Sequence, residues 1–116
     1  MDSQVYDRLE DLGAEIDDTL DRLMGDEELY NEYLEKFPQN NNILLLQKAV
    51  DEKDYDTAEK EVHTLKGIAL NLGFLPLADA CMMMLMDFRE GNPEAGAAQM
   101  PDVLEQFNAF KNAIIL

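Results

Sequence analysis

The sequence predicts an all-α protein that folds as an antiparallel helical bundle. Apolar residues recur three and four positions apart along most of the chain, which is the period of helices with one buried face. No segment shows the strict alternation of a half-buried strand, and no internal repeat is present. The 116 residues suffice for one hydrophobic core, so we expect a single domain over residues 1–116.

An N-terminal helical segment is predicted over about residues 3–24. Its apolar stripe consists of Val5, Leu9, Leu12, Ile16, Leu20 and Leu23. Gly13 interrupts this stripe and could divide the segment into two pieces, at a break that the pattern does not place. Gly25 ends the segment, and the core of the bundle is expected over about residues 26–116.

A bent second helix is predicted over about residues 26–52. Asp26 is a good N-cap, and the acidic residues after it favour the positive end of a helix. The residues expected to face inward are Tyr30, Tyr33, Leu34 and Phe37. Pro38 removes a backbone hydrogen bond and clashes with the preceding turn, which predicts a kink or a short interruption there.

The third helix is predicted to begin after its N-cap, Asp54, and to run to about Leu72. Gly73 then ends it in the left-handed conformation that glycine favours. Its buried stripe consists of Ala58, Val62, Leu65, Ala69 and Leu72. Only a short link, from Gly73 to Leu75, separates it from the next helix, so the two should be antiparallel neighbours.

The fourth helix has Pro76 in its first turn and ends near Gly91. Its inward stripe consists of Leu77, Cys81, Met84 and Phe88. Asn92 and Pro93 open the last segment, in which Pro101 predicts a kink after the first turn or two. The buried stripe of that segment consists of Val103, Phe107, Phe110 and Ile114.

The only histidine, His63, is predicted to lie on the outer face of the third helix. At about 100° per residue, it points about 160° away from Leu65, the middle of the buried stripe. Its neighbours on the helix surface are Glu59, Lys60, Lys66 and Gly67. Both lysines can stabilise an anion formed on the ring, and the carboxylate of Glu59 could orient the imidazole.

Gly67 is an unusual choice inside a helix, because glycine there costs about 0.5–1 kcal/mol relative to alanine. A turn without a side chain beside His63 would let a partner molecule approach the ring. Asn71 lies two turns further on and about 80° round the helix from His63, and is expected to brace the end of the helical hairpin.

The segment from His63 to Gly73 also carries a motif. It reads His63-Thr64-Leu65-Lys66-Gly67 and, after three positions, Asn71-Leu72-Gly73. This run resembles the H-x-L-K-G-x-x-x-N-x-G signature of histidine phosphotransfer (HPt) domains. The resemblance covers about 65 residues, from Gly25 to about Arg89. It includes both helix starts at Asp26 and Asp54 and the positions of Leu77 and Cys81. Met84 and Leu85 depart from the Leu-Glu that many members have there.

The resemblance implies a four-helix core with an additional N-terminal helix, and a phosphorelay intermediate rather than an independent enzyme. His63 would accept a phosphoryl group from the aspartyl phosphate of one receiver domain and pass it to the aspartate of another. Lys66 would stabilise the phosphate, and Gly67 would admit the partner. The expected partners are response-regulator receiver domains, with a hybrid histidine kinase as a further candidate. The chain would be a monomer without its own cofactor, and Mg²⁺ would be held by the receiver.

The charge of the chain excludes some partners. Nine basic residues against 25 acidic ones give a formal net charge of −16. Nine scattered positive charges cannot form the basic face that a nucleic acid requires, and an anionic membrane surface would repel the chain. We therefore expect no nucleic-acid or membrane partner. The acidity favours solubility and would steer a basic partner surface towards the protein.

The cellular location can be predicted from three observations. A single cysteine, Cys81, cannot form an internal disulfide and fits a reducing compartment. The N-terminal residues lack the features of a signal peptide. The longest apolar runs, 43–46 and 81–86, are far shorter than the ~18 residues of a membrane span. We expect a cytoplasmic protein, and Met1 favours a free-standing chain.

Other interpretations of the same residues remain open. The chain could be a helical docking module whose histidine is no longer phosphorylated, or an enzyme with His63 as general base, although no second catalytic group has a defined spacing. One His and one Cys on different helices predict no metal site. Two or three of Met82, Met83, Met84 and Met86 are expected to fill the core, and any left outside would form an apolar patch beside His63. Cys81 is expected to be an inert core thiol.

Overall fold

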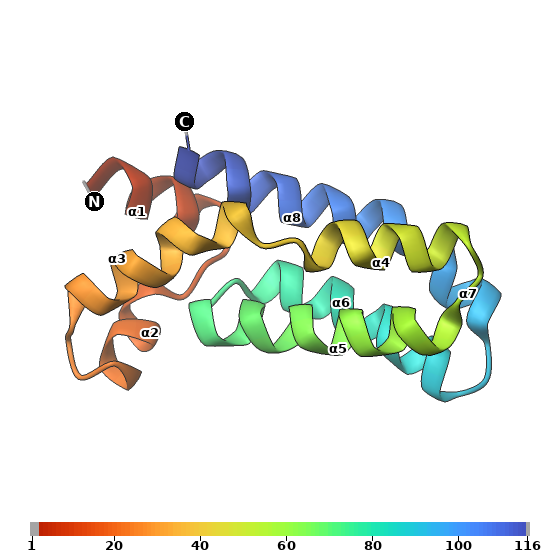
Figure 1. Cartoon of the computed structure of the whole chain (residues 1–116). Coiled ribbons are helices and arrows are strands. Elements are labelled where there is room, and N and C mark those ends of the chain that lie inside the picture. Colours follow the sequence, from red (N-terminus) through yellow and green to blue (C-terminus); the bar gives the residue numbers. More distant parts are fainter. Residues whose placement is uncertain (1–2, 116) are drawn as a thin grey trace.

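The computed structural model describes residues 3–115, which form helices joined by short connections (Figure 1). In chain order they are α1 (Ser3–Asp11), α2 (Ile16–Arg22), α3 (Glu27–Lys36), the 3₁₀ turn η1 (Phe37–Gln39), α4 (Asn42–Asp51), α5 (Tyr55–Leu72), α6 (Leu75–Arg89), α7 (Pro93–Ala97) and α8 (Met100–Ile115). Within this range the only β-type pairing is an isolated bridge between Ala14 and Phe74. The predicted all-α class is confirmed.

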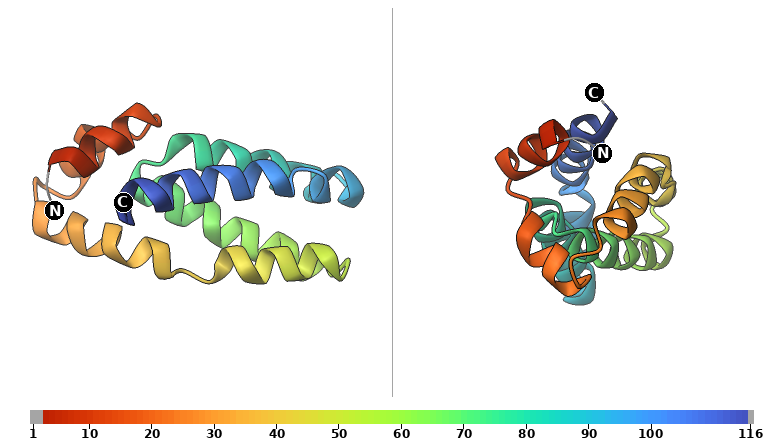
Figure 2. Two further views of the ribbon diagram at one scale, coloured as in Figure 1. Left: turned by 90° about the horizontal axis from the view of Figure 1, so that it is seen from above. Right: turned by 90° about the vertical axis from the view of Figure 1, so that its left-hand side faces the viewer.

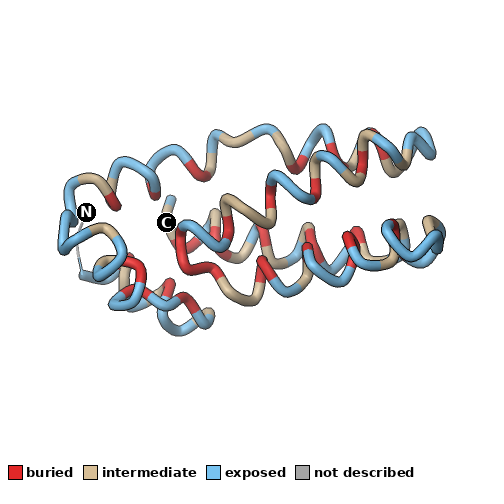
Figure 3. The backbone as a smooth tube through the Cα atoms, turned by 90° about the horizontal axis from the view of Figure 1, so that it is seen from below, coloured by how far each residue is buried: buried red, intermediate tan, exposed pale blue. Residues whose placement is uncertain are grey.

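Four helices, α4, α5, α6 and α8, form the core of the bundle (Figure 2). Short turns join α4 to α5 and α5 to α6, so that neighbouring helices run antiparallel. The buried residues face the space between the helices (Figure 3). At the end of the core where α5 turns into α6, the ring of Phe74 stacks on Phe110 with centroids 4.4 Å apart, and meets Phe37 edge-on at 5.1 Å. The predicted antiparallel bundle with a four-helix core is therefore present.

The N-terminal segment is two helices rather than one continuous helix over residues 3–24. Gly13, with a φ of 102°, lies in the turn between α1 and α2. The helix α1 packs along α8, where the Nε of Arg8 donates a 3.0 Å hydrogen bond to the carbonyl of Ala113. The chain then turns towards the α5–α6 hairpin, where the N–H of Glu15 donates to the carbonyl of Gly73 at 2.9 Å. The break at Gly13 thus lets α1 and α2 contact different parts of the bundle.

The predicted bent helix over residues 26–52 is two α-helices separated by η1. Asp26 caps α3 as predicted, and its carboxylate accepts a 3.0 Å hydrogen bond from the N–H of Leu29. Pro38 lies inside η1, and the chain then becomes extended at Asn40 before α4 begins, so the interruption is complete. Tyr33, predicted to face inward, is 40% exposed, because it lies at the edge of the stripe that the other three residues form.

The helix α5 matches its prediction in both caps and in its buried face. The carboxylate of Asp54 accepts hydrogen bonds from the N–H and the hydroxyl of Thr57, at 3.2 and 2.7 Å, and these bonds hold the pKa of Asp54 below its usual value. Gly73 ends the helix with a φ of 79°. All five residues predicted for the buried stripe are buried. Both ends of the helix that carries His63 are thereby fixed by local sequence.

The second half of the bundle departs from the prediction at two points, Pro101 and Ile114. All four residues predicted for the inward stripe of α6 are buried, and Pro76 lies in its first turn. The last segment is two helices, α7 and α8, and Pro101 occupies the first turn of α8, where proline is tolerated, instead of kinking a longer helix. Of the predicted stripe in α8, Ile114 is only partly buried and packs on the edge of the core.

Candidate functional site

His63 lies in the middle of α5 and is exposed, as predicted from its helical phase. The backbone beneath it belongs to an uninterrupted helix, which is packed against α4 on one side and α6 on the other. The position of the imidazole is therefore set by a rigid element, while the ring itself faces solvent. An exposed imidazole on a fixed helix is open to attack or be attacked by a group on another molecule.

The four predicted neighbours surround His63 along α5. Lys60 is exposed, whereas Glu59 and Lys66 are half-buried. Within residues 3–115, no hydrogen bond joins the side chain of Glu59 to the ring of His63, so its expected orienting role has no contact to support it. The two ammonium groups lie one turn before and one turn after the histidine, which places positive charge on both sides of the ring.

Gly67 has open space where a side chain would stand. A Cβ placed on it would have no non-neighbouring atom within 4 Å. Its backbone is helical, without the positive φ that would require glycine. Nothing in the packing of the described chain therefore explains a glycine at this position, whereas the approach of a second molecule to His63 would.

The helices α5 and α6 pack against each other, and helical phase assigns one stripe of residues on each helix to the outer edge of their seam. The stripe on α5 consists of Leu70, Lys66, His63 and Glu59, and the stripe on α6 consists of Leu75, Asp79, Met82 and Met86. Leu70 and Leu75 line the same surface hollow beside the turn that joins the helices. His63 lies seven residues before Leu70, and Met82 lies seven residues after Leu75. Because every helical residue rises by the same distance along its axis, His63 and Met82 are equally far from the turn of the hairpin.

Exposed methionines lie on this part of α6. Met82, Met83 and Met86 are 38%, 58% and 50% exposed, and only Met84 of the cluster is buried. The expectation that two or three of the four fill the core is wrong, since Leu85 and Cys81 occupy the positions next to Met84 on the inward face. By helical phase, Met82 and Met86 lie on the side of α6 that borders α5, where an apolar patch was expected, whereas Met83 is turned away from it.

Cys81 lies on the inward face of α6. Burial raises the pKa of its thiol to about 12, and the positive charge of Lys66 lowers that pKa to a smaller extent. Cys81 is completely buried, which confirms that it is a core thiol.

The C-terminal end of α5 is held by contacts that sequence patterns did not reveal. A Cβ on Gly73 would clash with the hydroxyl of Thr19 and lie 2.8 Å from the carbonyl oxygen of Glu15, so the packing of the fold accounts for a glycine at this position. Arg22 of α2 donates a 3.1 Å hydrogen bond to the carbonyl of Leu70. Asn71 is exposed, and no hydrogen bond of its side chain within the described residues supports the expected bracing role.

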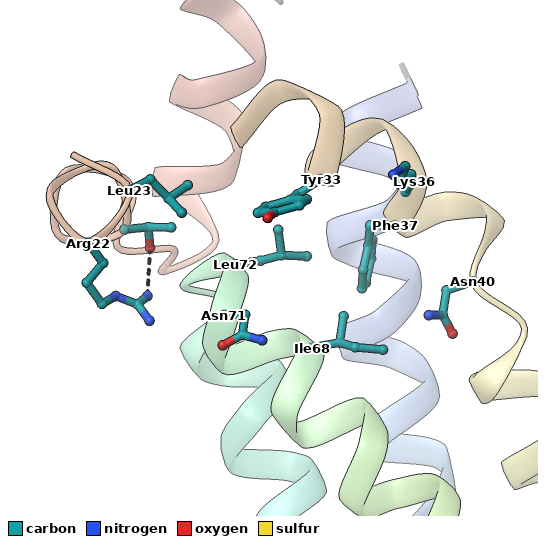
Figure 4. Close-up of a pocket in the computed structure, with 10 residues that line it drawn as sticks. Arg22, Leu23, Tyr33, Lys36, Phe37, Asn40, Ile68, Asn71 and Leu72 are labelled. Carbon is teal, nitrogen blue, oxygen red and sulfur yellow. Dashed lines mark hydrogen bonds between the residues drawn. The ribbon is translucent and has the colours of Figure 1, made fainter. Parts of the chain in front are cut away.

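Asn71 instead lines a surface pocket of about 510 Å³ between α2, α3, η1 and α5 (Figure 4). Leu72 and Ile68 of α5 lie opposite Tyr33 and Phe37 there (Figure 4). The other lining residues are Thr19, Arg22, Leu23, Lys36 and Asn40. The full lining comes from α2, α3, η1, α5 and the connections after α2 and η1, so no local sequence pattern could have predicted that these residues meet. The pocket shares α5 with His63 but opens on a different side of that helix.

Two kinds of feature are absent from residues 3–115. No group of three or more His, Cys, Asp or Glu side chains is arranged to hold a metal ion. None of the helices there has both the length and the apolar character needed to cross a membrane.

Comparison with known proteins gives one clear result. The family model described as Hpt domain matches residues 5–113, nearly the whole chain. The match extends well beyond the 65 residues of the motif-based resemblance and includes α1 and α8. No curated protein and no solved structure matches the chain in the same comparisons.

Proposed function

The chain belongs to the Hpt domain family, whose members are phosphotransfer modules of two-component signalling, and on this premise we propose that His63 is its phosphoryl carrier. Hpt domains interact with response-regulator receiver domains. In this proposal His63 accepts a phosphoryl group from the aspartyl phosphate of one receiver and passes it to the aspartate of another. The protein is then a carrier in a phosphorelay, and its partners alternate on one surface.

The observation that carries the proposal is the exposed position of the only histidine, between two lysines and a glycine with open space around it. A ring nitrogen attacks the phosphorus of the aspartyl phosphate, a P–N bond forms, and the P–O bond to the carboxylate breaks. The carboxylate leaves as an anion, and the other ring N–H can release its proton to solvent. The reverse sequence delivers the group to the second receiver. Phosphoryl transfer of this kind depends on positioning and charge stabilisation.

Lys66 and Gly67 have distinct roles in this proposal. The ammonium of Lys66 lies one turn from His63 and stabilises the phosphoryl oxygens in the transition state and in the product. Gly67 leaves room above the backbone for the acidic pocket of the receiver. Of the four helical neighbours of His63, only Glu59 is acidic, so we assign the Mg²⁺ of the reaction to the receiver.

The proposal is tested by mixing the chain with receiver domains from the same genome that have been phosphorylated with radiolabelled acetyl phosphate. We expect label on the chain that is lost in acid and kept in alkali, as for a phosphoramidate, and mass spectrometry should place it on His63. The same mixture without a receiver is the control for direct labelling. Binding of receivers without any label would instead favour the docking module.

A further inference from the structure

We propose that Met82 and Met86 are an oxidation site, at which conversion to methionine sulfoxide slows phosphoryl transfer by weakening partner docking. The inference rests on the proposed function, because it concerns the surface around His63. It assigns a role to exposed methionines that the transfer chemistry itself does not use.

The position of Met82 and Met86 follows from the two stripes along the α5–α6 seam. Met82 is level with His63 along the hairpin. Met86 lies eleven residues after Leu75 and Glu59 lies eleven residues before Leu70, so these two are level with each other as well. Packed helices lie about 8–10 Å apart. Both methionines are therefore about one helix spacing from the histidine stripe, on the side of α6 that borders α5.

A partner that reaches His63 must cover these side chains. A protein interface of ordinary size covers about 800 Å² of each partner, which corresponds to a disc of about 16 Å radius. Such a disc centred on His63 includes the turn of α6 that is level with His63, and this holds for any orientation of the partner about His63. In the reduced protein, Met82 and Met86 offer an apolar and adaptable contact surface.

The chemistry requires a two-electron oxidant, for which we name hydrogen peroxide. The thioether sulfur attacks one peroxide oxygen, an S–O bond forms and the O–O bond breaks, and the other oxygen takes the proton of the first and leaves as water. The product is a polar sulfoxide, which methionine sulfoxide reductases convert back to the thioether. A sulfoxide dipole that is buried at an interface without a hydrogen-bond partner lowers affinity by about tenfold or more.

Other methionines of the chain serve as controls for oxidation at Met82 and Met86. Met83 is more exposed than Met82, yet its helical phase turns it about 100° from Met82 and away from α5. Met24, 95% exposed, lies in the turn between α2 and α3, outside the α5–α6 hairpin. Both should oxidise as readily as the proposed site without lying at the seam. Met84 is buried and should stay reduced while the protein is folded.

The experiment treats the purified chain with hydrogen peroxide, removes the oxidant with catalase, and then measures transfer from a phosphorylated receiver at subsaturating concentrations. Mass spectrometry determines which methionines carry oxygen, and circular dichroism checks the fold. Each variant is compared with its own untreated sample. The variants are the double substitution Met82→Leu with Met86→Leu, and the single substitutions Met83→Leu and Met24→Leu, all close in volume to the parent.

We expect oxidation to slow transfer by the parent about tenfold or more, and reductase treatment to restore the rate. The Met83→Leu and Met24→Leu chains should lose rate to the same extent, whereas the double variant should keep its own untreated rate. A parent that carries sulfoxide at both positions and still transfers at its untreated rate would overturn the inference. A double variant that is slowed as strongly as the parent would overturn it as well. Absence of transfer in the untreated parent would instead count against the proposed function.

Discussion

The hydroxyl of Tyr30 donates a 2.9 Å hydrogen bond to the backbone carbonyl of Leu72, and so joins α3 to the end of the helix that carries His63. Tyr30 is completely buried, and its ring stacks on that of Tyr6 with centroids 6.1 Å apart. Burial of the phenol raises the pKa of Tyr30, so the hydroxyl remains a donor throughout the neutral range. The end of α5 is therefore fixed from the side of α3 by this bond and from the side of α2 by Arg22.

The first prediction concerns this bond. Tyr30→Phe removes the hydroxyl but keeps the ring, so it leaves the Leu72 carbonyl without its donor. We expect a loss of about 1–3 kcal/mol in the free energy of unfolding, measured by urea denaturation. Tyr33→Phe, on a half-exposed ring of the same helix, is the matched control and should change stability by less than about 0.5 kcal/mol. Equal effects of the two substitutions would show that the buried bond contributes nothing.

The second prediction contrasts the two glycines of the motif. Gly73→Ala places a methyl group against Thr19 and Glu15 at a positive φ, and should destabilise the protein by about 1–3 kcal/mol. Gly67→Ala meets no such obstacle and should stabilise it by about 0.5–1 kcal/mol through helix propensity. Thermal and urea unfolding of both variants check the signs. The assignment of Gly73 to the fold would be wrong if its alanine variant were as stable as the parent.

The third prediction separates the docking role of Gly67 from its effect on stability. Gly67→Gln restores helix propensity and puts a long side chain one turn from His63. The variant should be at least as stable as the parent, while transfer from a phosphorylated receiver falls by about tenfold or more, because the side chain occupies the approach to the ring. Single-turnover transfer rates are compared with unfolding curves of the same samples. Transfer at the parental rate would mean that the partner does not approach over Gly67.

The fourth prediction concerns the charge beside the ring. Lys66→Ala should slow transfer about 10–1000-fold, the range for loss of one electrostatic stabiliser of a transition state. Lys48→Ala removes an exposed lysine of α4 and is the control for a change in net charge alone. Rapid-quench measurement of a single turnover separates the chemical step from docking. If both alanine variants transferred equally fast, Lys66 would serve only to keep the helix solvated.

Much of the site could be predicted because its determinants are local. The N-cap at Asp54, the glycine at position 73 and the periodicity of α5 lie within one helix, and together they predict that His63 faces outward. The exposure of the Tyr33 side chain could not be predicted from periodicity. Tyr33 lies at the edge of its apolar stripe, where packing against other helices determines whether a side chain is buried.

The remaining features depend on contacts between distant segments. The contact of Gly73 with Thr19 joins positions that are far apart in the sequence. The hydrogen bond from Arg22 to Leu70 likewise spans 48 positions. The periodicity of apolar residues predicts which face of one helix is buried. It does not predict which turn of another helix will pack against that face. For the same reason the pocket lined by Asn71 was not predicted.

The most direct measurement is the labelling of His63→Gln by a phosphorylated receiver. The residue faces solvent, so the substitution should leave helicity and melting temperature nearly unchanged. We expect no transferred phosphate on this variant, while the parent in a parallel reaction carries acid-labile, alkali-stable label. A folded His63→Gln protein that still accepts phosphate from the receiver would place the acceptor on another residue and contradict the account.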